Sequence, residues 1–442
     1  MGKRALVLAG GGSRGAYQIG AWKALRELGI TFDIVTGSSV GALNGALMVQ
    51  GDFEAGLELW ENISPGDVMT DILATGDLST MPESTVWRSF VRDTLEKGGC
   101  DITPLENTLR RLLDEPRFRS SPIDYALVTV EYPSLKPQEL TKNQIPEGMV
   151  CDYLLASSAC FPAFKMKEIN GSKFLDGGYH DNLPMNLAIR MGADEIIAID
   201  LQSMGIIRKP KMDPDKLTII RSQWNLGPFI LFDKSCARRN IKLGYLDTMK
   251  AFGRLCGWKY AFSPEDCKHN AQQLLTVLIA ATTEARMNQL ILTNTLESSL
   301  YRSLLKDLSS LDIPEEKITI GQQITRMAEY AGEIFRLDPT ERYSFADFNQ
   351  TLLKQLHDLQ KDLDFSHQGW SSIPKIIDEL KQHDRMYICA YLREQLQQLF
   401  QKEESPRNLL LFAPTFPEEL LAALYLLLLE RKGQPQNWPN LF

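Results

Sequence analysis

Two glycine-rich stretches, Gly10-Gly11-Gly12-Ser13-Arg14-Gly15 and Gly37-Ser38-Ser39-Val40-Gly41, decide the fold class of this chain. Each follows a short apolar run typical of a buried strand, residues 5–9 and 32–36, and each leads into a segment with helical spacing of its apolar residues. Strands that alternate with helices favour a largely parallel sheet flanked by helices. We expect both turns at the carboxyl ends of their strands, where proteins of this class bind ligands.

The first stretch is compatible with three kinds of ligand site. A helix that begins after a glycine turn presents free N–H groups, which favour negative charge. A phosphate-binding P-loop needs Lys and Ser or Thr after its last glycine, but Ala16 and Tyr17 stand there. The spacing Gly10-x-Gly12-x-x-Gly15 matches a dinucleotide fingerprint, which requires an acidic residue at the end of the second strand. A serine turn stands there instead, so an oxyanion hole is favoured over a nucleotide-dependent oxidoreductase.

The second stretch has the pattern of a nucleophile elbow, Gly37-x-Ser39-x-Gly41, between a strand and a helix. In that turn the serine takes a strained backbone conformation that exposes its Oγ, and the crowded flanking positions require glycine. We therefore predict Ser39 as the nucleophile. Ser38 occupies the variable position of the motif and is the weaker candidate.

A serine nucleophile needs a base, and Asp176 is the best-placed candidate. It ends an apolar run and enters Gly177-Gly178, which predicts a strand-to-loop corner where a carboxylate can be aimed. A carboxylate hydrogen-bonded to a serine can act as general base without an imidazole. An ordinary Asp-Gly-Gly turn is the alternative. The histidines are less well placed, and His180 is expected to be only a loop residue: His180, His269, His357, His367 and His383.

Together these motifs resemble the patatin-like phospholipase family. The likeness extends over about residues 4–202 and includes residues 156–164 and the run from Asp176 to Pro184. It implies a catalytic dyad of Ser39 and Asp176 and an oxyanion hole formed by the backbone amides of Gly11 and Gly12, with Arg14 nearby. The motif glycines are then Gly10, Gly15, Gly37, Gly41, Gly177 and Gly178.

The resemblance implies a lipid acyl hydrolase of the phospholipase A or lysophospholipase type, which cleaves carboxylic esters through an acyl-enzyme. A lipid ester is the expected partner, and no cofactor or metal is expected. A regulatory or scaffold protein that acts through its C-terminal helices is the alternative. For Arg14 two roles are open, support of the oxyanion hole or reception of an anionic headgroup.

The expected architecture is a patatin-like three-layer α/β domain over residues 1–262, followed by a helical domain of unknown role over residues 263–442. Further strands are predicted at residues 125–131, 195–201 and 217–220. Helical patterns with few glycines follow: residues 271–296, 320–336, 348–363, 376–401 and 417–431.

Three further segments bear on how a lipid could reach the site. Residues 51–101 resemble the region that covers the site in such enzymes. Residues 224–232 are strongly apolar, so they either pack in the core or touch a membrane or acyl chain. Residues 208–211 form a short basic cluster, which is more typical of a solvated loop than of a headgroup site.

Composition sets outer limits on function and location. The 442 residues are 44% hydrophobic and 24% charged, as in ordinary globular proteins of two or three domains. A net charge of −8 argues against nucleic-acid binding and against bulk attraction to anionic membranes, so any peripheral membrane contact should be apolar and local. We expect neither a signal peptide nor a membrane span. Seven scattered cysteines predict reduced thiols and a cytoplasmic location.

Overall fold

The computed structural model describes residues 2–70, 99–289, 319–361, 373–401, 412 and 414–432. The chain divides into two compact units, Met1–Phe252 and Gly253–Phe442. This division lies ten residues before the boundary expected after residue 262. Residues 253–262 lie in the second unit because the short strand β9 (Ala261–Phe262) pairs there with β10 (Arg342–Tyr343).

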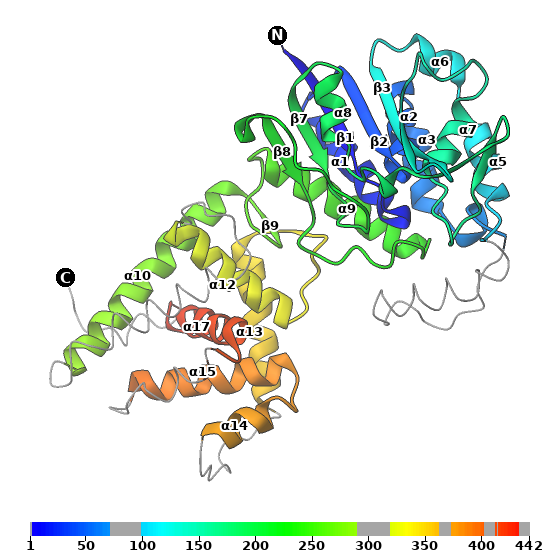
Figure 1. The fold of residues 1–442 in the computed structure, drawn as a ribbon. Helices are drawn as coiled ribbons and strands as arrows, with labels where there is room; N and C mark the ends of the chain where they lie inside the picture. Colours follow the sequence, from blue (N-terminus) through cyan, green and yellow to red (C-terminus); the bar gives the residue numbers. More distant parts are fainter. Residues whose placement is uncertain are drawn as a thin grey trace. The chain divides into compact units, whose positions relative to one another are not determined.

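The first unit is built on one eight-stranded sheet within the described residues. Its strands are β1 (Lys3–Leu8), β2 (Ile34–Ser38), β3 (Asp124–Tyr132), β4 (Lys136–Thr141), β5 (Lys167–Ile169), β6 (Ser172–Asp176), β7 (Ala193–Ile199) and β8 (Leu217–Ile220). They follow the order β5-β6-β3-β2-β1-β7-β8, with β4 paired to β3. The five strands from β3 to β8 in this order are parallel. The expected largely parallel sheet is confirmed (Figure 1).

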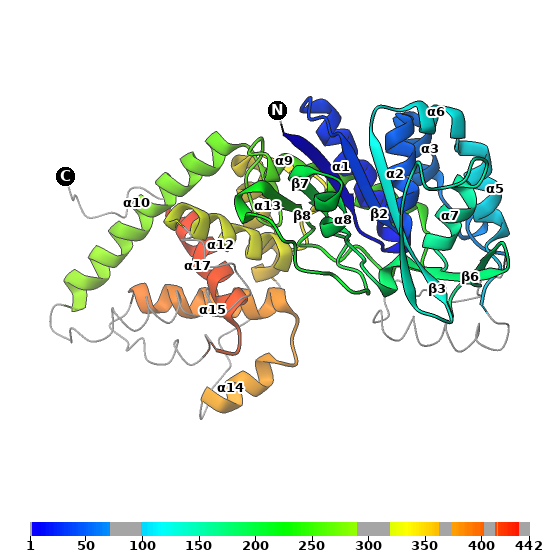
Figure 2. The same ribbon diagram turned by 45° about the horizontal axis from the view of Figure 1, so that its top comes forward.

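Strands β4, β5 and β6 are antiparallel additions. The strand expected to end at Asp176 is β6, whereas β4 and β5 were not predicted. They extend the sheet beyond β3, and Figure 2 shows β3 and β6 beside one another. Because β6 runs against β3, its last residue, Asp176, pairs with Thr129. The antiparallel strand therefore still delivers its carboxylate to the edge where β2 ends.

Helices cover both faces of this sheet. They are α1 (Ala16–Glu27), α2 (Val40–Gln50), α3 (Phe53–Asn62), α5 (Thr103–Leu112), α6 (Glu115–Ser120), α7 (Val150–Ser157), α8 (Met185–Arg190) and α9 (Lys234–Ala251). Side chains of successive strand residues point to opposite faces. In β2, Val35 lies against Gly45 of α2, whereas the Thr36 hydroxyl donates to Pro184 O at the start of α8. Helices α2 and α8 thus lie on opposite faces, which makes three layers.

Helix α9 was not predicted, and it packs directly on α1. Two glycines allow the close approach, since a Cβ on Gly20 would lie 1.8 Å from Ile241 O and one on Gly244 would lie 2.0 Å from Tyr17 O. The Tyr17 hydroxyl also donates to Asp247 of α9 at 2.8 Å. Sequence periodicity alone did not reveal this contact because it joins segments more than 200 residues apart.

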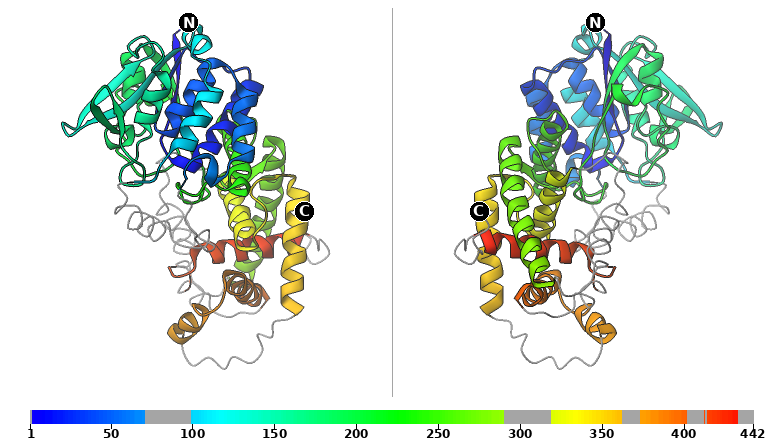
Figure 3. Two further views of the ribbon diagram at one scale, coloured as in Figure 1. Left: turned by 90° about the vertical axis from the view of Figure 1, so that its right-hand side faces the viewer. Right: turned by 90° about the vertical axis from the view of Figure 1, so that its left-hand side faces the viewer.

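The second unit is helical within its described residues, apart from β9 and β10. Its helices are α10 (Pro264–Gln289), α12 (Ile320–Ile334), α13 (Phe345–Lys361), α14 (Ile373–Leu380), α15 (Arg385–Gln401) and α17 (Pro417–Lys432). Helix α17, red in Figure 3, packs against α10, α12, α13 and α15. Its apolar run, Leu420–Leu429, contributes the buried centre of this unit.

Two sequence expectations for the second unit are wrong. The helix predicted over residues 376–401 is two helices, because the chain turns after Leu380 and Asp384 starts α15 by accepting the Tyr387 N–H at 2.8 Å. The expectation that all cysteines are reduced also fails, since Cys256 and Cys267 form a disulfide. The disulfide joins the segment before β9 to the first turn of α10.

Other expectations concern apolar segments that could meet a lipid. Residues 224–232 pack in the core, with Leu226, Phe229 and Phe232 buried, which is the first of the alternatives that the sequence left open. In the segment 51–101, Trp60 and Met69 are buried, while the apolar residues between 71 and 98 lie outside the described residues. No described helix has the length and apolar character needed to cross a bilayer.

Candidate active site

Ser39 lies in the sharp turn between β2 and α2. Its φ of 53° and ψ of −130° are unusual for a residue with a side chain and correspond to about 1–3 kcal/mol of backbone strain. The turn is crowded: a Cβ on Gly37 would lie 2.5 Å from Gly41 C, and one on Gly41 would lie 2.3 Å from Leu8 O. Both flanking positions therefore require glycine, as the sequence motif predicts.

The two serines of the turn differ in access. Ser39 is partly exposed, whereas Ser38 is completely buried. The Ser38 hydroxyl has no hydrogen-bond partner among the described residues, and it lies against Gly177. Of the two serines, only Ser39 is accessible from the surface.

A hydrogen bond from outside the turn supports the strained backbone of Ser39. Its N–H donates to the Ser157 Oγ at 3.0 Å, and the Ser157 hydroxyl donates to Val128 O at 2.7 Å. Ser157 thus links the turn to the neighbouring strand β3. Its motif was noted in the sequence, but this role depends on tertiary contacts and was missed.

Asp176 lies at the end of β6 and is 5% exposed. Burial raises the pKa of its carboxyl group to about 6, and hydrogen bonds from the Ser39 side chain and the Gly178 N–H oppose this rise. The Gly178 bond is 2.7 Å long. The structure therefore brings together Ser39 and Asp176, which are 137 residues apart in the sequence, and surrounds the carboxylate with a site of low polarity.

The first glycine stretch lies against this pair. A Cβ on Gly10 would be 3.0 Å from the Ser39 Cβ, so the loop passes directly beside Ser39. The Gly10 N–H donates to Asn182 O at 3.0 Å. In the described part of the chain, no acceptor takes the N–H groups of Gly11 or Gly12. These two amides are available for a ligand oxygen.

Arg14 connects the first glycine stretch, called the glycine loop below, to neighbouring segments of the backbone. Its side chain is buried and donates to Gly227 O at 2.8 Å, to Gln202 O at 2.7 Å and to Leu201 O at 3.3 Å. Of the two roles left open by the sequence, this geometry favours support of the loop. The expected position beside the loop is therefore observed, with the guanidinium directed to backbone carbonyls.

Asn182 is a further site residue whose role the sequence did not reveal. It is buried, and its side-chain amide donates to Gly10 O at 3.2 Å. Its Oδ1 lies so close to Gly10 and Gly178 that a Cβ on either glycine would be 2.3 Å or 2.9 Å away. Asn182 therefore joins the glycine loop to the loop that carries Asp176.

The remaining titratable groups lie outside the pair. His180 neighbours Arg208 and Glu139, and its pKa is lowered by burial and by the Arg208 charge. Asp181 is buried, which raises its pKa to about 6, and it accepts the Leu183 N–H. Among the described residues, no group of His, Cys, Asp and Glu is placed to hold a metal ion.

Comparison with known families matches residues 6–189 to the patatin-like phospholipase model. The matched segment contains both glycine stretches, the elbow serine and the Asp-Gly-Gly corner. Residues 6–189 are a patatin-like phospholipase domain. The family expected from the sequence is thereby confirmed.

Several curated proteins resemble the patatin-like domain at low identity. Patatin-like phospholipase domain-containing protein ZK370.4 of Caenorhabditis elegans is 28% identical over 45% of this chain and 14% of its own length. Lysophospholipase NTE1 of Kluyveromyces lactis is 28% identical over 56% of this chain and 16% of its own length. Human patatin-like phospholipase domain-containing protein 6 is 29% identical over 45% and 13%. The chain thus covers only about a seventh of these relatives.

Solved structures give weaker likenesses. VipD from Legionella pneumophila is 14% identical, with 99% of this chain and 94% of that chain covered, at a TM-score of 0.39. The type III effector ExoU is 16% identical over 84% and 76% of the two chains, at a TM-score of 0.29. At these scores neither likeness bears on function.

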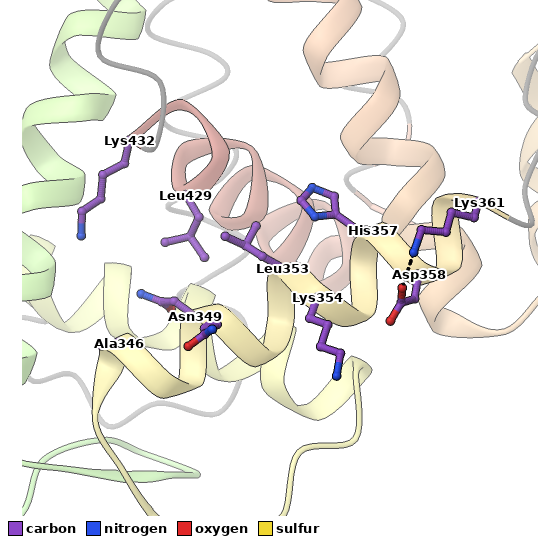
Figure 4. Close-up of a pocket in the computed structure, with 10 residues that line it drawn as sticks. Ala346, Asn349, Leu353, Lys354, His357, Asp358, Lys361, Leu429 and Lys432 are labelled. Carbon is purple, nitrogen blue, oxygen red and sulfur yellow. Dashed lines mark hydrogen bonds and ion pairs between the residues drawn. The ribbon is translucent and has the colours of Figure 1, made fainter.

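The helical unit contains a cavity of about 700 Å³ that is separate from the patatin-like domain. Figure 4 shows that α13 and α17 supply its labelled side chains. Two of its lining side chains have carboxylate neighbours, since His357 lies 3.4 Å from Glu430 and Lys361 lies 2.7 Å from Asp358. Nothing in this lining resembles the pairing of Ser39 with Asp176.

The patatin-like domain should tolerate no side chain at Gly12. Its φ of 53° is left-handed, and a Cβ there would lie 2.1 Å from Phe229 O, a backbone atom that also accepts the Ser13 N–H. We expect Gly12→Ala to lower the free energy of unfolding by about 3 kcal/mol or more. Thermal unfolding measures this, with Gly56→Ala as control. Gly56 has only ordinary contacts and should be neutral, so equal losses for both variants would contradict the argument.

Proposed function

We propose that this chain is a lipid acyl hydrolase of the phospholipase A or lysophospholipase type, with Ser39 as nucleophile and Asp176 as general base. The proposal is supported most strongly by one observation. A carboxylate that is almost fully buried accepts a hydrogen bond from the only accessible serine hydroxyl of a strained elbow. The names of the relatives, phospholipases and lysophospholipases, point to the same class of substrate.

In the first step Asp176 takes the proton from the Ser39 hydroxyl while Oγ attacks the ester carbonyl. Burial and the raised pKa favour this transfer, because a carboxylate in a dry site is a stronger base than one in water. The Gly178 N–H holds the carboxylate in orientation throughout. The base needs no imidazole in this scheme.

The attack places negative charge on the former carbonyl oxygen. The N–H groups of Gly11 and Gly12 are the proposed donors to this oxyanion, since the loop that carries them lies beside Ser39. Arg14 and Asn182 keep that loop in position through bonds to backbone carbonyls. Loss of a single oxyanion donor typically lowers the rate by about 10²–10³-fold.

The tetrahedral intermediate then expels the alcohol, which takes the proton held by Asp176, and the acyl group remains on Ser39. Water attacks the acyl-enzyme after giving its proton to Asp176. Collapse of this second intermediate releases the fatty acid and returns the proton to Ser39. The scheme applies to carboxylic esters, of which a lysophospholipid carries one and a diacyl phospholipid two.

The purified chain tests the proposal on a panel of phospholipids, lysophospholipids and neutral glycerides, with products followed by mass spectrometry. We expect release of free fatty acid from at least one phospholipid class. Absence of hydrolysis on the whole panel, and on a short-chain soluble ester, would favour the regulatory or scaffold alternative.

The pH dependence of kcat/KM should report Asp176. Because its folded-state pKa is about 6, the base is protonated and inactive below that value and ionised above it. We expect kcat/KM on a soluble ester to fall about tenfold per pH unit below pH 6 and to level off above pH 7. His180→Ala is the control, since His180 lies four residues from Asp176 and its pKa is lowered by burial and by the Arg208 charge. An acidic limb that vanishes in His180→Ala would identify the histidine as the base instead.

A further inference from the structure

The loop that joins β7 to β8 exposes an unusual number of apolar side chains. Met204, Ile206 and Ile207 are 56%, 50% and 44% exposed, although they lie within four consecutive positions. Single exposed apolar residues are common on protein surfaces, whereas a contiguous apolar patch marks a contact surface. The residues 204–211 are called the surface loop below (Figure 1).

Backbone hydrogen bonds connect the surface loop directly to the candidate active site. The Ile206 N–H donates to Gly178 O at 3.0 Å, and the Asn182 N–H donates to Ile206 O at 2.6 Å. Gly178 in turn donates its N–H to the Asp176 carboxylate. The backbone of Ile206 is therefore hydrogen-bonded directly to the loop that carries the proposed base, and its exposed side chain lies beside that loop. Tyr179, on that same loop, is also 47% exposed.

Positive charge follows the apolar residues immediately. Arg208, Lys209 and Lys211 are all exposed. Asn186 fixes this part of the loop, because its side-chain amide donates to Lys209 O and accepts the Lys211 N–H, both at 3.0 Å. The cations are thus presented on an ordered backbone.

The acidic groups near the surface loop have hydrogen-bond or ion-pair contacts of their own. Arg208 donates to His180 O, and Glu139 lies within ion-pair distance of His180 and pairs with Arg190. Asp213 accepts the Asp215 N–H and so starts the turn that follows the loop. Over residues 203–216 the charged residues are Arg208, Lys209, Lys211 and Lys216 against Asp213 and Asp215, which leaves a local excess of positive charge.

We propose that the surface loop, together with Tyr179, docks the chain on the surface of an anionic phospholipid bilayer. The proposal rests on the proposed function and adds where the lipid substrate is met. Apolar side chains beside exposed lysines match the boundary between acyl chains and anionic headgroups. The chain as a whole carries a net charge of −8, so attraction to an anionic surface must come from such a local cluster.

Vesicle co-sedimentation tests the docking without depending on catalysis. The full chain carrying Ser39→Ala is mixed with vesicles of phosphatidylcholine that contain either no or about one third phosphatidylglycerol. We expect binding to the anionic vesicles, weakened by salt. Adding Ile207→Asp and Lys209→Glu should weaken it about tenfold or more, because one apolar contact and one cation are lost.

The matched control is Leu135→Asp with Lys136→Glu on the same Ser39→Ala background. Leu135 is 63% exposed and Lys136 is exposed, and both lie at the β3–β4 turn, so the chemical changes are equivalent. The control pair should bind as tightly as its parent. Thermal unfolding checks that both double variants are folded, and Lys209→Glu with Lys211→Glu replaces the first pair if it is not.

Three results would overturn the docking surface: no binding by the parent, equal binding by the Ile207–Lys209 variant, or equal weakening in the control. The two proposals can fail separately. Failure of the proposed function appears as wild-type chain that does not hydrolyse a monomeric soluble ester. Failure of the docking surface appears only in the vesicle measurements, which use inactive protein.

Discussion

Replacing Ser39 with alanine should lower kcat/KM for lipid ester hydrolysis by about 10³-fold or more, to the background of the assay. The reason is that the reaction then lacks its nucleophile, and no second hydroxyl of the turn is available to replace it. Ser38 is completely buried and cannot meet a substrate. The measurement is fatty-acid release from the best lipid of the panel.

Ser38→Ala is the matched control, with the same chemical change one residue away. The Ser38 hydroxyl is buried and unpaired among the described residues, so its removal should leave activity within about threefold and should not lower stability. An active Ser39→Ala variant, or an inactive Ser38→Ala variant that is folded, would contradict the assignment of the nucleophile.

Asp176→Asn should abolish activity and at the same time stabilise the fold. The carboxyl has a pKa of about 6 in the folded chain and near 4 in the unfolded chain. The folded state therefore binds the proton more tightly, and this stabilisation is present below pH 4 and lost as the pH rises through 6. At pH 8 the buried charge opposes folding, by an amount on the order of 1–3 kcal/mol.

The neutral amide removes this penalty and can still accept the Gly178 N–H. We expect Tm at pH 8 to rise by about 2–8 °C and the gain to vanish near pH 4. Asp181→Asn is the control, since Asp181 is also buried with a pKa near 6 but does not contact Ser39. It should gain stability and keep most activity. A fully active Asp176→Asn variant would remove Asp176 from the mechanism.

The parts of the fold that could be predicted are those in which local backbone geometry dictates the residue. Gly12, Gly37 and Gly41 stand where the backbone takes a left-handed conformation or approaches another chain segment too closely for a Cβ. These backbone requirements place glycines at fixed spacings in the sequence. The alternation of buried strands with helices could also be predicted, because it follows from the periodicity of apolar residues.

What could not be predicted depends on partners distant in the sequence. Ser157 and Asn182 support the turn and the glycine loop through contacts that span 118 and 172 residues. Strands β4 and β5 are short and partly exposed, so their sequence pattern is weak. The turn between α14 and α15 contains no glycine or proline, and only the capping contact of Asp384 reveals it.

The fluorophosphonate reaction tests the central claim most directly, because such a probe forms a covalent bond only with an activated serine. The wild-type chain is treated with the probe and digested, and the modified peptide is identified by mass spectrometry. We predict a single adduct on Ser39, absent from Ser39→Ala and strongly slowed in Asp176→Asn. Modification of another serine that persists in Ser39→Ala, with Ser39 itself unmodified, would contradict the account.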